Sequence, residues 1–294
     1  MHRSFAWLSI ALCQGCSFHG LPPALDAAST VPAQNFQFQD GGRAIFFTLD
    51  KSLSPESASR AETFVFVISG SDCTSMQYFL PHYFRGLEGE SGPLRIFILQ
   101  KRFIEERTWG RNLGCSRDFI KADHPSRWIA DQTEFIRAQL DLAHRRSASP
   151  QRIVVAGISE GGDIVPVLAR AIPAVTHAVI IANGGMNPLD AYRLQAERQG
   201  FSADLAALSA LDTPPADPDA PAHYIGGRTW RYWAELRDLK HTENLLALSM
   251  PVWMAMGDAD QAVPVASALY LRDQFALHRK ANLTLMVYPG ADHS

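Results

Sequence analysis

The sequence has no strong excess of charge of either sign. Its 27 Lys and Arg residues face 30 Asp and Glu residues, which leaves a net charge of −3 over 294 residues. The basic residues are scattered, apart from the pairs Lys101 with Arg102 and Arg145 with Arg146, which we expect on the solvated surface. Because a polyanion is recognised by a basic patch, we expect no nucleic-acid partner.

The common motifs of metal and nucleotide sites are missing as well. The ten histidines include no His-Glu-x-x-His motif, and neither a phosphate-binding glycine loop nor a dinucleotide fingerprint occurs. We therefore expect no cofactor and no metal. The isolated histidines are interpreted as surface or packing residues: His82, His124, His144, His223 and His241.

Cysteine is scarce, with four in the chain, and two of them lie close to the amino terminus. Positive charge at residues 1–3 precedes a mostly apolar run at 5–12, which is too short to span a bilayer as a helix. This pattern is typical of a secretory signal over residues 1–15. Its end resembles the bacterial lipoprotein signal, in which Cys16 is acylated after cleavage, although that signal favours leucine where this chain has Cys13.

The lipoprotein interpretation predicts an exported, periplasmic protein that is anchored to the membrane by a lipid on Cys16. A plain secretory signal and an unprocessed cytosolic segment are the alternatives. A metal or thioredoxin-type pair of Cys13 with Cys16 is disfavoured, because the two follow an apolar run instead of a strand-to-helix turn. Residues 16–34 include a stretch rich in Pro, Ala and Ser, which suits a tether.

Cleavage before Cys16 would leave Cys73 and Cys115 as the other two cysteines of the mature chain. Two remaining cysteines tend to pair in an oxidising compartment, so we predict a disulfide between them. The alternative is two unrelated buried thiols. A disulfide would clamp the loop at 69–75 to the long polar connection at 100–123.

The hydrophobic content of 47% allows a large core, and we predict one α/β domain over residues 35–294. Ser126 is predicted to cap a helix that exposes Asp131 on its polar face, and Pro166 is predicted to kink a helix at 160–171. Apolar or alternating runs predict an edge hairpin at 35–49 and strands at 63–68, 94–99, 153–155, 177–182, 251–256 and 283–288.

The strand at 153–155 leads into the five residues Gly-Ile-Ser-Glu-Gly at 157–161, and a helical pattern follows. Gly157 and Gly161 leave room for a turn so tight that Ser159 takes a strained backbone conformation, which lifts its hydroxyl off the sheet. Ser159 is therefore a candidate nucleophile. The alternative is an ordinary glycine-rich turn between a strand and a helix.

Small residues at 69–75 follow the strand at 63–68 and leave backbone N–H groups that the sheet does not use. Acyl transfer needs two such donors, aimed at the negative oxygen of the tetrahedral intermediate. We expect one from the N–H of Glu160, directly after the candidate nucleophile, and the other from Ser71 or Asp72. The alternative is a simple connection between a strand and a helix.

Asp260 and His293 each follow a predicted strand, at 251–256 and 283–288 respectively. Both side chains would reach the edge of the sheet at which Ser159 lies. The order Ser, Asp, His along the chain suits a catalytic triad.

These segments together resemble the α/β-hydrolase family, over a range of about 35–293. Residues 157–161 match the nucleophile elbow of that family, 257–264 its acid loop and 290–293 its histidine loop. The resemblance implies a mostly parallel central sheet with flanking helices. Family members generally carry a helix after the histidine, whereas this sequence stops at Ser294. We therefore expect either a clipped sequence or a looser histidine loop with weak or no activity.

The resemblance also implies a role for each residue of the triad. His293 would accept the proton of Ser159 and later deliver it to the leaving group, while Asp260 orients the imidazole and stabilises its charged form. Asp260 fits the acid position of the family better than Asp258 does. Asp292 is interpreted as a loop residue.

Residues 186–249 interrupt the alternation of strands and helices, and we interpret them as a helical cap inserted over the carboxyl edge of the sheet. Its aromatic residues either line an acyl or aryl pocket or only hold the cap together: Tyr224, Trp230, Tyr232 and Trp233.

The predicted function is that of a serine hydrolase that cleaves a small-molecule carboxylic ester through an acyl-enzyme. A peptidase of the prolyl oligopeptidase type is the first alternative, although the chain is too short for the propeller of that family. A non-catalytic hydrolase-like lipoprotein that only binds a ligand under its cap is the second.

Overall fold

The computed structural model describes residues 31–51, 63–87, 93–110, 114–200 and 208–293. The predicted signal at 1–15, Cys16 and the tether up to residue 30 lie outside the described residues, as does the side chain of His82. None of the described helices is both long enough and apolar enough to cross a membrane.

The described residues form one eight-stranded sheet with the order β1-β2-β4-β3-β5-β6-β7-β8. β1 and β2 pair antiparallel at one edge, β2 is antiparallel to β4, and the remaining pairs are parallel. The edge hairpin and the mostly parallel sheet are therefore confirmed. The strands are β1 (Gln34–Gln37), β2 (Arg43–Lys51), β3 (Thr63–Ile68), β4 (Leu94–Leu99), β5 (Arg152–Ile158), β6 (His177–Ile181), β7 (Val252–Gly257) and β8 (Leu283–Tyr288).

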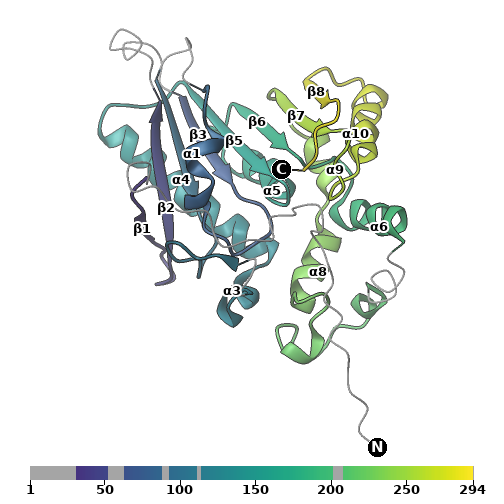
Figure 1. Ribbon diagram of the computed structural model, residues 1–294. Coiled ribbons are helices and arrows are strands. Elements are labelled where there is room, and N and C mark those ends of the chain that lie inside the picture. Colours follow the sequence, from purple (N-terminus) through teal and green to yellow (C-terminus); the bar gives the residue numbers. More distant parts are fainter. Residues whose placement is uncertain (1–30, 52–62, 88–92, 111–113, 201–207, 294) are drawn as a thin grey trace, which may run out of the picture.

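Helices pack on both faces of the sheet (Figure 1). On one face, residues such as Phe135 and Ile164 join the larger core, and on the other face Leu80 packs against Ile96 and Ile98. The helices are α1 (Leu80–Tyr83), α3 (Arg117–Ala122), α4 (Pro125–Arg145), α5 (Gly161–Ala171), α6 (Pro188–Gln199), α8 (Trp230–Asp238), α9 (His241–Leu246) and α10 (Val265–Leu277), and short 3-10 helices lie at Met76–Tyr78, Leu208–Asp212 and Pro221–His223.

The central strands are continuous apolar runs because successive side chains enter different cores. In β3, Phe66 packs in the larger core and Val67 in the smaller one. Ile68 at the end of β3 pairs with Gly157 near the end of β5. This register places the loop after β3 beside the turn that carries Ser159.

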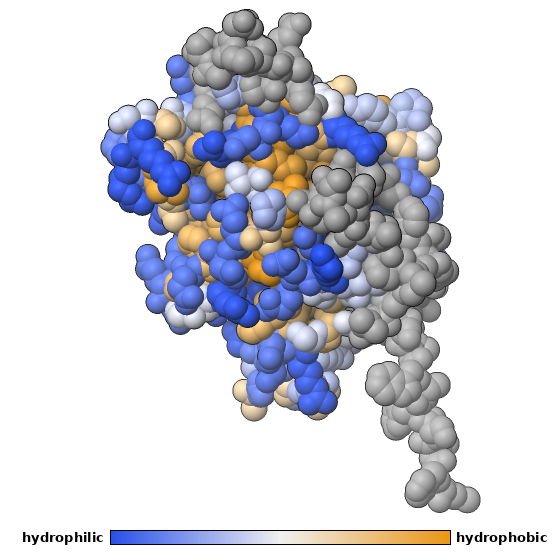
Figure 2. Space-filling model, turned by 60° about the vertical axis from the view of Figure 1, so that its left-hand side comes forward, coloured by the Kyte–Doolittle hydropathy of each residue, from blue (hydrophilic) through white to orange (hydrophobic). Residues whose placement is uncertain are grey.

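The sheet is covered less completely toward its β8 edge. Hydrophobic residues also reach the surface on the side of the molecule that carries β1 and β2 in Figure 1, where hydrophilic residues surround them (Figure 2). Four large side chains of β6, β7 and β8, on the face that α1 packs against elsewhere, remain 41–47% exposed: Ile181, Trp253, Met286 and Tyr288. The apolar cluster that includes Leu80 of α1 covers β2 to β5 on this face and reaches Val179 of β6.

The chain between β6 and β7 forms α6, α8 and α9, which account for much of the predicted cap at 186–249. Figure 1 shows α6 and α8 beyond the carboxyl ends of the parallel strands. Residues 201–207 of the predicted cap lie outside the described ranges.

One expectation about helix geometry, the N-cap of α4, is wrong. α4 begins at Pro125 with His124 as its N-cap, so Ser126 is not the cap. Proline is favoured at the first helical position, where its missing N–H is not needed. The N–H and hydroxyl of Ser126 instead donate to the carboxylate of Glu235 on α8, at 2.7 and 3.0 Å. α5 continues as a helix past Pro166.

The expectation that Lys101 and Arg102 are solvated is wrong, as is the exposed position expected for Asp131. The side chains are 9%, 10% and 10% exposed, and Arg102 donates to both carboxylate oxygens of Asp131 at 2.7 and 2.8 Å. Such pairing offsets part of the cost of burying charge. Arg145 and Arg146 are exposed, as predicted.

Cys73 and Cys115 form a disulfide, as predicted, with their Cα atoms 5.6 Å apart and 42 residues apart in sequence. Cys73 and Phe119 of α3 belong to one small apolar cluster, and Cys115 packs against it. The disulfide therefore fixes the loop after β3 to the segment that precedes α3.

We expect the double variant Cys73→Ala with Cys115→Ala to lose about 4 kcal/mol of unfolding free energy, because a loop of this length is no longer closed in the unfolded chain. Urea denaturation of the variant and the wild type measures the loss. The wild type under a reducing agent should lose a similar amount, and an unchanged midpoint in both samples would contradict the prediction.

Candidate active site

Ser159 lies at the tight turn between β5 and α5 and has a positive φ of 52°. The strained conformation predicted for this residue is therefore present. A Cβ on Gly157 would lie 2.5 Å from the carbonyl oxygen of Gly161, and a Cβ on Gly161 would lie 2.3 Å from the carbonyl oxygen of Ile68. Only glycine fits at both positions, so the motif at 157–161 is required by the close approach of the backbone.

The histidine loop is held by a second close approach of the backbone. A Cβ on Gly257, at the end of β7, would lie 2.1 Å from the carbonyl oxygen of Ala291. Ala259 N–H donates to that carbonyl at 3.0 Å, and the carboxylate of Asp258 accepts from the N–H of Gly290 at 2.7 Å. Asp258 thus stabilises the histidine loop and is not the acid that pairs with the imidazole.

Ser159, His293 and Asp260 meet at the carboxyl edge of the sheet. His293 Nε2 is 2.9 Å from Ser159 Oγ, and His293 Nδ1 is 2.8 Å from Asp260 Oδ2. Asp260 is 1% exposed, and its other oxygen accepts from the N–H groups of Ala262 and Val263 at 2.7 and 2.8 Å. The hydroxyl, the imidazole and the carboxylate form one hydrogen-bonded line, although 134 residues separate Ser159 from His293.

The loop after β3 lies directly against Ser159. A Cβ on Gly70 would be 3.1 Å from Ser159 Cβ, and Ser71 lines the same cavity as Ser159 and Glu160. The carboxylate of Asp72 instead accepts from the N–H groups of Cys73 and Thr74, at 2.6 and 3.2 Å. Of the two residues considered for the second oxyanion donor, Ser71 therefore borders the cavity, whereas the side chain of Asp72 shapes the loop.

A cavity of about 170 Å³ opens beside Ser159 and His293. Apolar walls come from the chain between β6 and β7, including Met186, Leu189 and Trp233. Two of the four aromatic residues singled out in the sequence, Tyr232 and Trp233, line this cavity, and Tyr224 and Trp230 are not among its lining residues.

Solved structures with a similar fold are hydrolases. Est1E from Butyrivibrio proteoclasticus has a TM-score of 0.57 and 16% identity, over 89% of this chain and 90% of that one. An α/β hydrolase from Penicillium sp. sh18 has a TM-score of 0.50 and 15% identity, over 89% and 90%. The chain has the α/β-hydrolase fold.

A third structure of this fold is the acylaminoacyl peptidase from Pyrococcus horikoshii, with a TM-score of 0.52 and 13% identity. The match covers 90% of this chain but 38% of the peptidase, so this chain spans well under half the length of that protein. No protein-family model and no curated protein matches the sequence.

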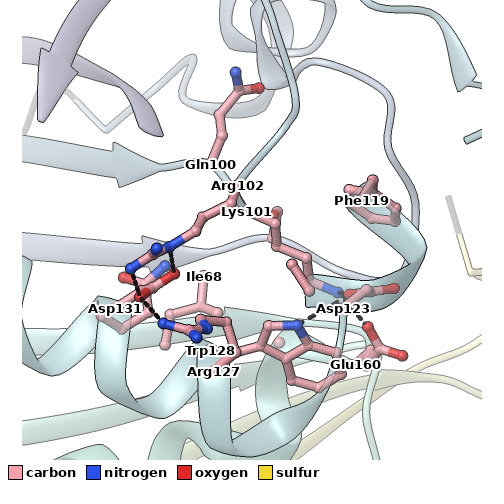
Figure 3. Close-up of a pocket in the computed structure, with 14 residues that line it drawn as sticks. Ile68, Gln100, Lys101, Arg102, Phe119, Asp123, Arg127, Trp128, Asp131 and Glu160 are labelled. Atoms are coloured by element: carbon pink, nitrogen blue, oxygen red, sulfur yellow. Dashed lines mark hydrogen bonds and ion pairs between the residues drawn. The ribbon is translucent and has the colours of Figure 1, made fainter. Parts of the chain in front are cut away.

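In this α/β-hydrolase fold the residue after the candidate nucleophile, Glu160, carries a buried carboxylate that is held from two sides. Lys101 Nζ donates to it at 2.6 Å, and the hydroxyl of Tyr232 donates to its other oxygen. Lys101 also donates to Asp123 at 2.8 Å and lies 3.9 Å from the centre of the Trp128 ring. Figure 3 shows this arrangement, with the Lys101 ammonium beside Asp123 and Glu160.

Sequence reasoning missed this network, because its members are far apart along the chain. One signal was available: a glutamate in a tight turn against the sheet must be buried, and a buried carboxylate needs a cation or several donors. Tyr232 of α8 and Arg228, which pairs with Asp123 and lies 4.8 Å over the Tyr232 ring, extend the network into the chain between β6 and β7.

Burial shifts the pKa values of three groups in this region. It lowers the pKa of Lys101 to about 8, although the Glu160 carboxylate opposes the shift, and it raises the pKa of Tyr232 well above its ordinary value. It also raises the pKa of Asp163 to about 7, against the effect of a hydrogen bond from Asn183. At neutral pH Lys101 is thus largely protonated and able to pair with Glu160.

Among the described residues, one group could bring three ligand atoms onto a metal ion: Asp72, Cys73 and Cys115. The two cysteine sulfurs are bonded to each other, whereas a metal requires thiolates. This group therefore does not fit a metal site.

We expect Lys101→Met to lower the unfolding free energy by about 3–5 kcal/mol, because the buried carboxylates of Glu160 and Asp123 lose their shared cation. Lys280→Met is the matched control, since Lys280 donates to a backbone carbonyl, that of Leu248, at 2.7 Å. The control should lose about 1 kcal/mol. Chemical denaturation measures both losses. Equal losses would show that Lys101 does not stabilise the buried carboxylates of Glu160 and Asp123 as expected.

Proposed function

We propose that this protein is a serine hydrolase that cleaves carboxylic esters through an acyl-enzyme on Ser159. The observation that carries the proposal is the hydrogen-bonded line from Asp260 through His293 to the Ser159 hydroxyl, beside a partly apolar cavity of about 170 Å³. The fold it shares with Est1E, which was also solved with ferulic acid bound, adds support, because ferulic acid is an aromatic carboxylic acid.

In the proposed acylation step, Ser159 Oγ attacks the carbonyl carbon of the ester while its proton passes to His293 Nε2. The tetrahedral intermediate collapses, the bond to the alcohol oxygen breaks, and the imidazolium gives that oxygen the proton. Asp260 remains ionised throughout and stabilises the imidazolium through Nδ1–H. The products of this step are the free alcohol and an ester of Ser159.

Deacylation repeats the same steps with water. His293 takes a proton from a water molecule as its oxygen attacks the acyl carbon, and it then returns a proton to Ser159 Oγ as the carboxylic acid leaves. The negative oxygen of both intermediates would be held by the backbone N–H groups of Glu160 and Ser71. The proximity of Ser71 to Ser159 around the cavity supports this assignment.

We expect Ser159→Ala and His293→Ala each to lower kcat for 4-nitrophenyl esters by about 10³-fold or more, because either change removes the nucleophile or its base. Asp260→Asn should lower kcat by a comparable factor. Asp258→Asn is the matched control in the same loop, and it should retain far more activity. A fluorophosphonate probe should label the wild type and not the Ser159→Ala variant.

The same assays separate the competing functions. Faster turnover of peptide anilides than of esters would favour a peptidase, and absence of labelling with a folded protein would favour a binding protein without catalysis. Label that persists in Ser159→Ala would contradict the role of this serine.

We also propose that the protein is exported and anchored by a lipid on Cys16. The Cys73–Cys115 disulfide supports export, since such bonds persist in oxidising compartments.

Cys16→Ser should move the protein from the membrane fraction to the soluble fraction, because the acylated residue is lost. Cys13→Leu is the control in the same segment, because leucine is the residue that this signal favours there, and it should leave the protein in the membrane fraction. Fractionation and immunoblotting measure the distribution, and an unchanged distribution for Cys16→Ser would contradict the anchor.

A further inference from the structure

Two polar side chains that line the cavity beside Ser159 have no role in the proposed mechanism. Asp163 of α5 and Asn183, just after β6, line the cavity, and each is 7% exposed. Asn183 Nδ2 donates to Asp163 Oδ1 at 2.9 Å, and no hydrogen-bond partner among the described residues reaches Asn183 Oδ1. A buried oxygen without a donor is costly, which suggests that a ligand supplies the donor.

The pair lies next to the turn that carries Ser159. The N–H of Asp163 donates to the carbonyl of Glu160 at 3.1 Å, in the first turn of α5. Asp163 is four residues after Ser159, and both residues line the same cavity. A flexible substrate group in this cavity therefore borders both the candidate nucleophile and the pair.

The charges around the pair favour a cation. The ionised residues of the buried network include two cations, Lys101 and Arg228, and two carboxylates, Glu160 and Asp123, which balance. Asp163 adds a third carboxylate, and its side-chain hydrogen bond comes from the neutral amide of Asn183. An ionised Asp163 therefore leaves one negative charge in excess beside the cavity.

We propose that Asp163 and Asn183 form a subsite that binds an ammonium group of the substrate, so that the preferred esters carry a basic amine a few carbon atoms from the scissile carbonyl. This inference rests on the proposed ester hydrolysis and specifies its substrate class. An ammonium has three N–H donors, enough for the carboxylate of Asp163 and the oxygen of Asn183 together, whereas a hydroxyl has one.

Three esters of equal length test the subsite: 4-nitrophenyl hexanoate, 6-hydroxyhexanoate and 6-aminohexanoate. The wild type should cleave the amino ester with a kcat/KM about tenfold or more above that of the hexanoate, mainly through a lower KM. The hydroxy ester should fall between the two. Asp163→Asn and Asn183→Leu should reduce the preference for the amino ester without a matching loss on the hexanoate.

Gln199→Leu is the matched control, because Gln199 lines the same cavity from the end of α6 and donates to the carbonyl of Gln261. It should keep the full preference. If Asn183→Leu fails to fold, Asp163→Asn decides the outcome alone, since an amide replaces the carboxyl group with little change in shape.

The ratio of the two kcat/KM values should also rise with pH through about 7, where Asp163 ionises and gains its charge. Any effect of pH on the catalytic steps that the two esters share cancels in the ratio. The other ionisable groups around Asp163 are Glu160, Lys101, Tyr232 and His241. Asp163→Asn should make the ratio independent of pH.

Equal kcat/KM values for the three esters would overturn the subsite and leave ester hydrolysis intact. An equal gain for the hydroxy and amino esters would overturn the assignment to an ammonium group. Cleavage of none of the three would contradict the proposed function itself, together with the subsite that rests on it. If the preference for the amino ester survives in Asp163→Asn, residues other than Asp163 cause it.

Discussion

The constraint on which the site depends is the approach of the turn after β5 to the end of β3. The backbone there is so close that a single methyl group on Gly161 would lie 2.3 Å from the carbonyl oxygen of Ile68. Ser159 consequently has a φ of 52°, which is unfavourable for a residue with a side chain, and its N–H donates to the carbonyl of Ile181 at 2.9 Å. This backbone conformation costs about 1–3 kcal/mol, which the packing around the turn must offset.

A similar constraint places the histidine. Gly257 allows β7 to meet Ala291, and the Asp258 carboxylate fixes Gly290, so the short loop after β8 has little freedom at its base. The two glycine-dependent contacts act at neighbouring points along the same edge of the sheet. They bring Ser159 and His293 within hydrogen-bond distance, although the two residues are 134 apart in sequence.

The parts of this structure that the sequence predicted are those with a local cause. Apolar runs predicted the strands, and the glycine pattern at 157–161 predicted the strained turn, because each depends on residues that are adjacent in the chain. Ser126 was misassigned as a cap, since the choice between it and Pro125 depends on Glu235 of a distant helix. The burial of Lys101 was missed for the same reason, because its partner Glu160 follows 59 residues later.

Burial of Glu160 beside the nucleophile has a consequence for the whole site. The carboxylate is 8% exposed, and its donors come from distant segments: Lys101 follows β4, and Tyr232 belongs to the chain between β6 and β7. Arg228 of the same segment joins the network through Asp123. That segment also forms the wall of the cavity, including Trp233. Any shift of the wall therefore alters the hydrogen bonds of Glu160, whose backbone N–H is the proposed oxyanion donor. In the proposed mechanism, substrate selection and stabilisation of the reacting oxygen therefore depend on one set of contacts.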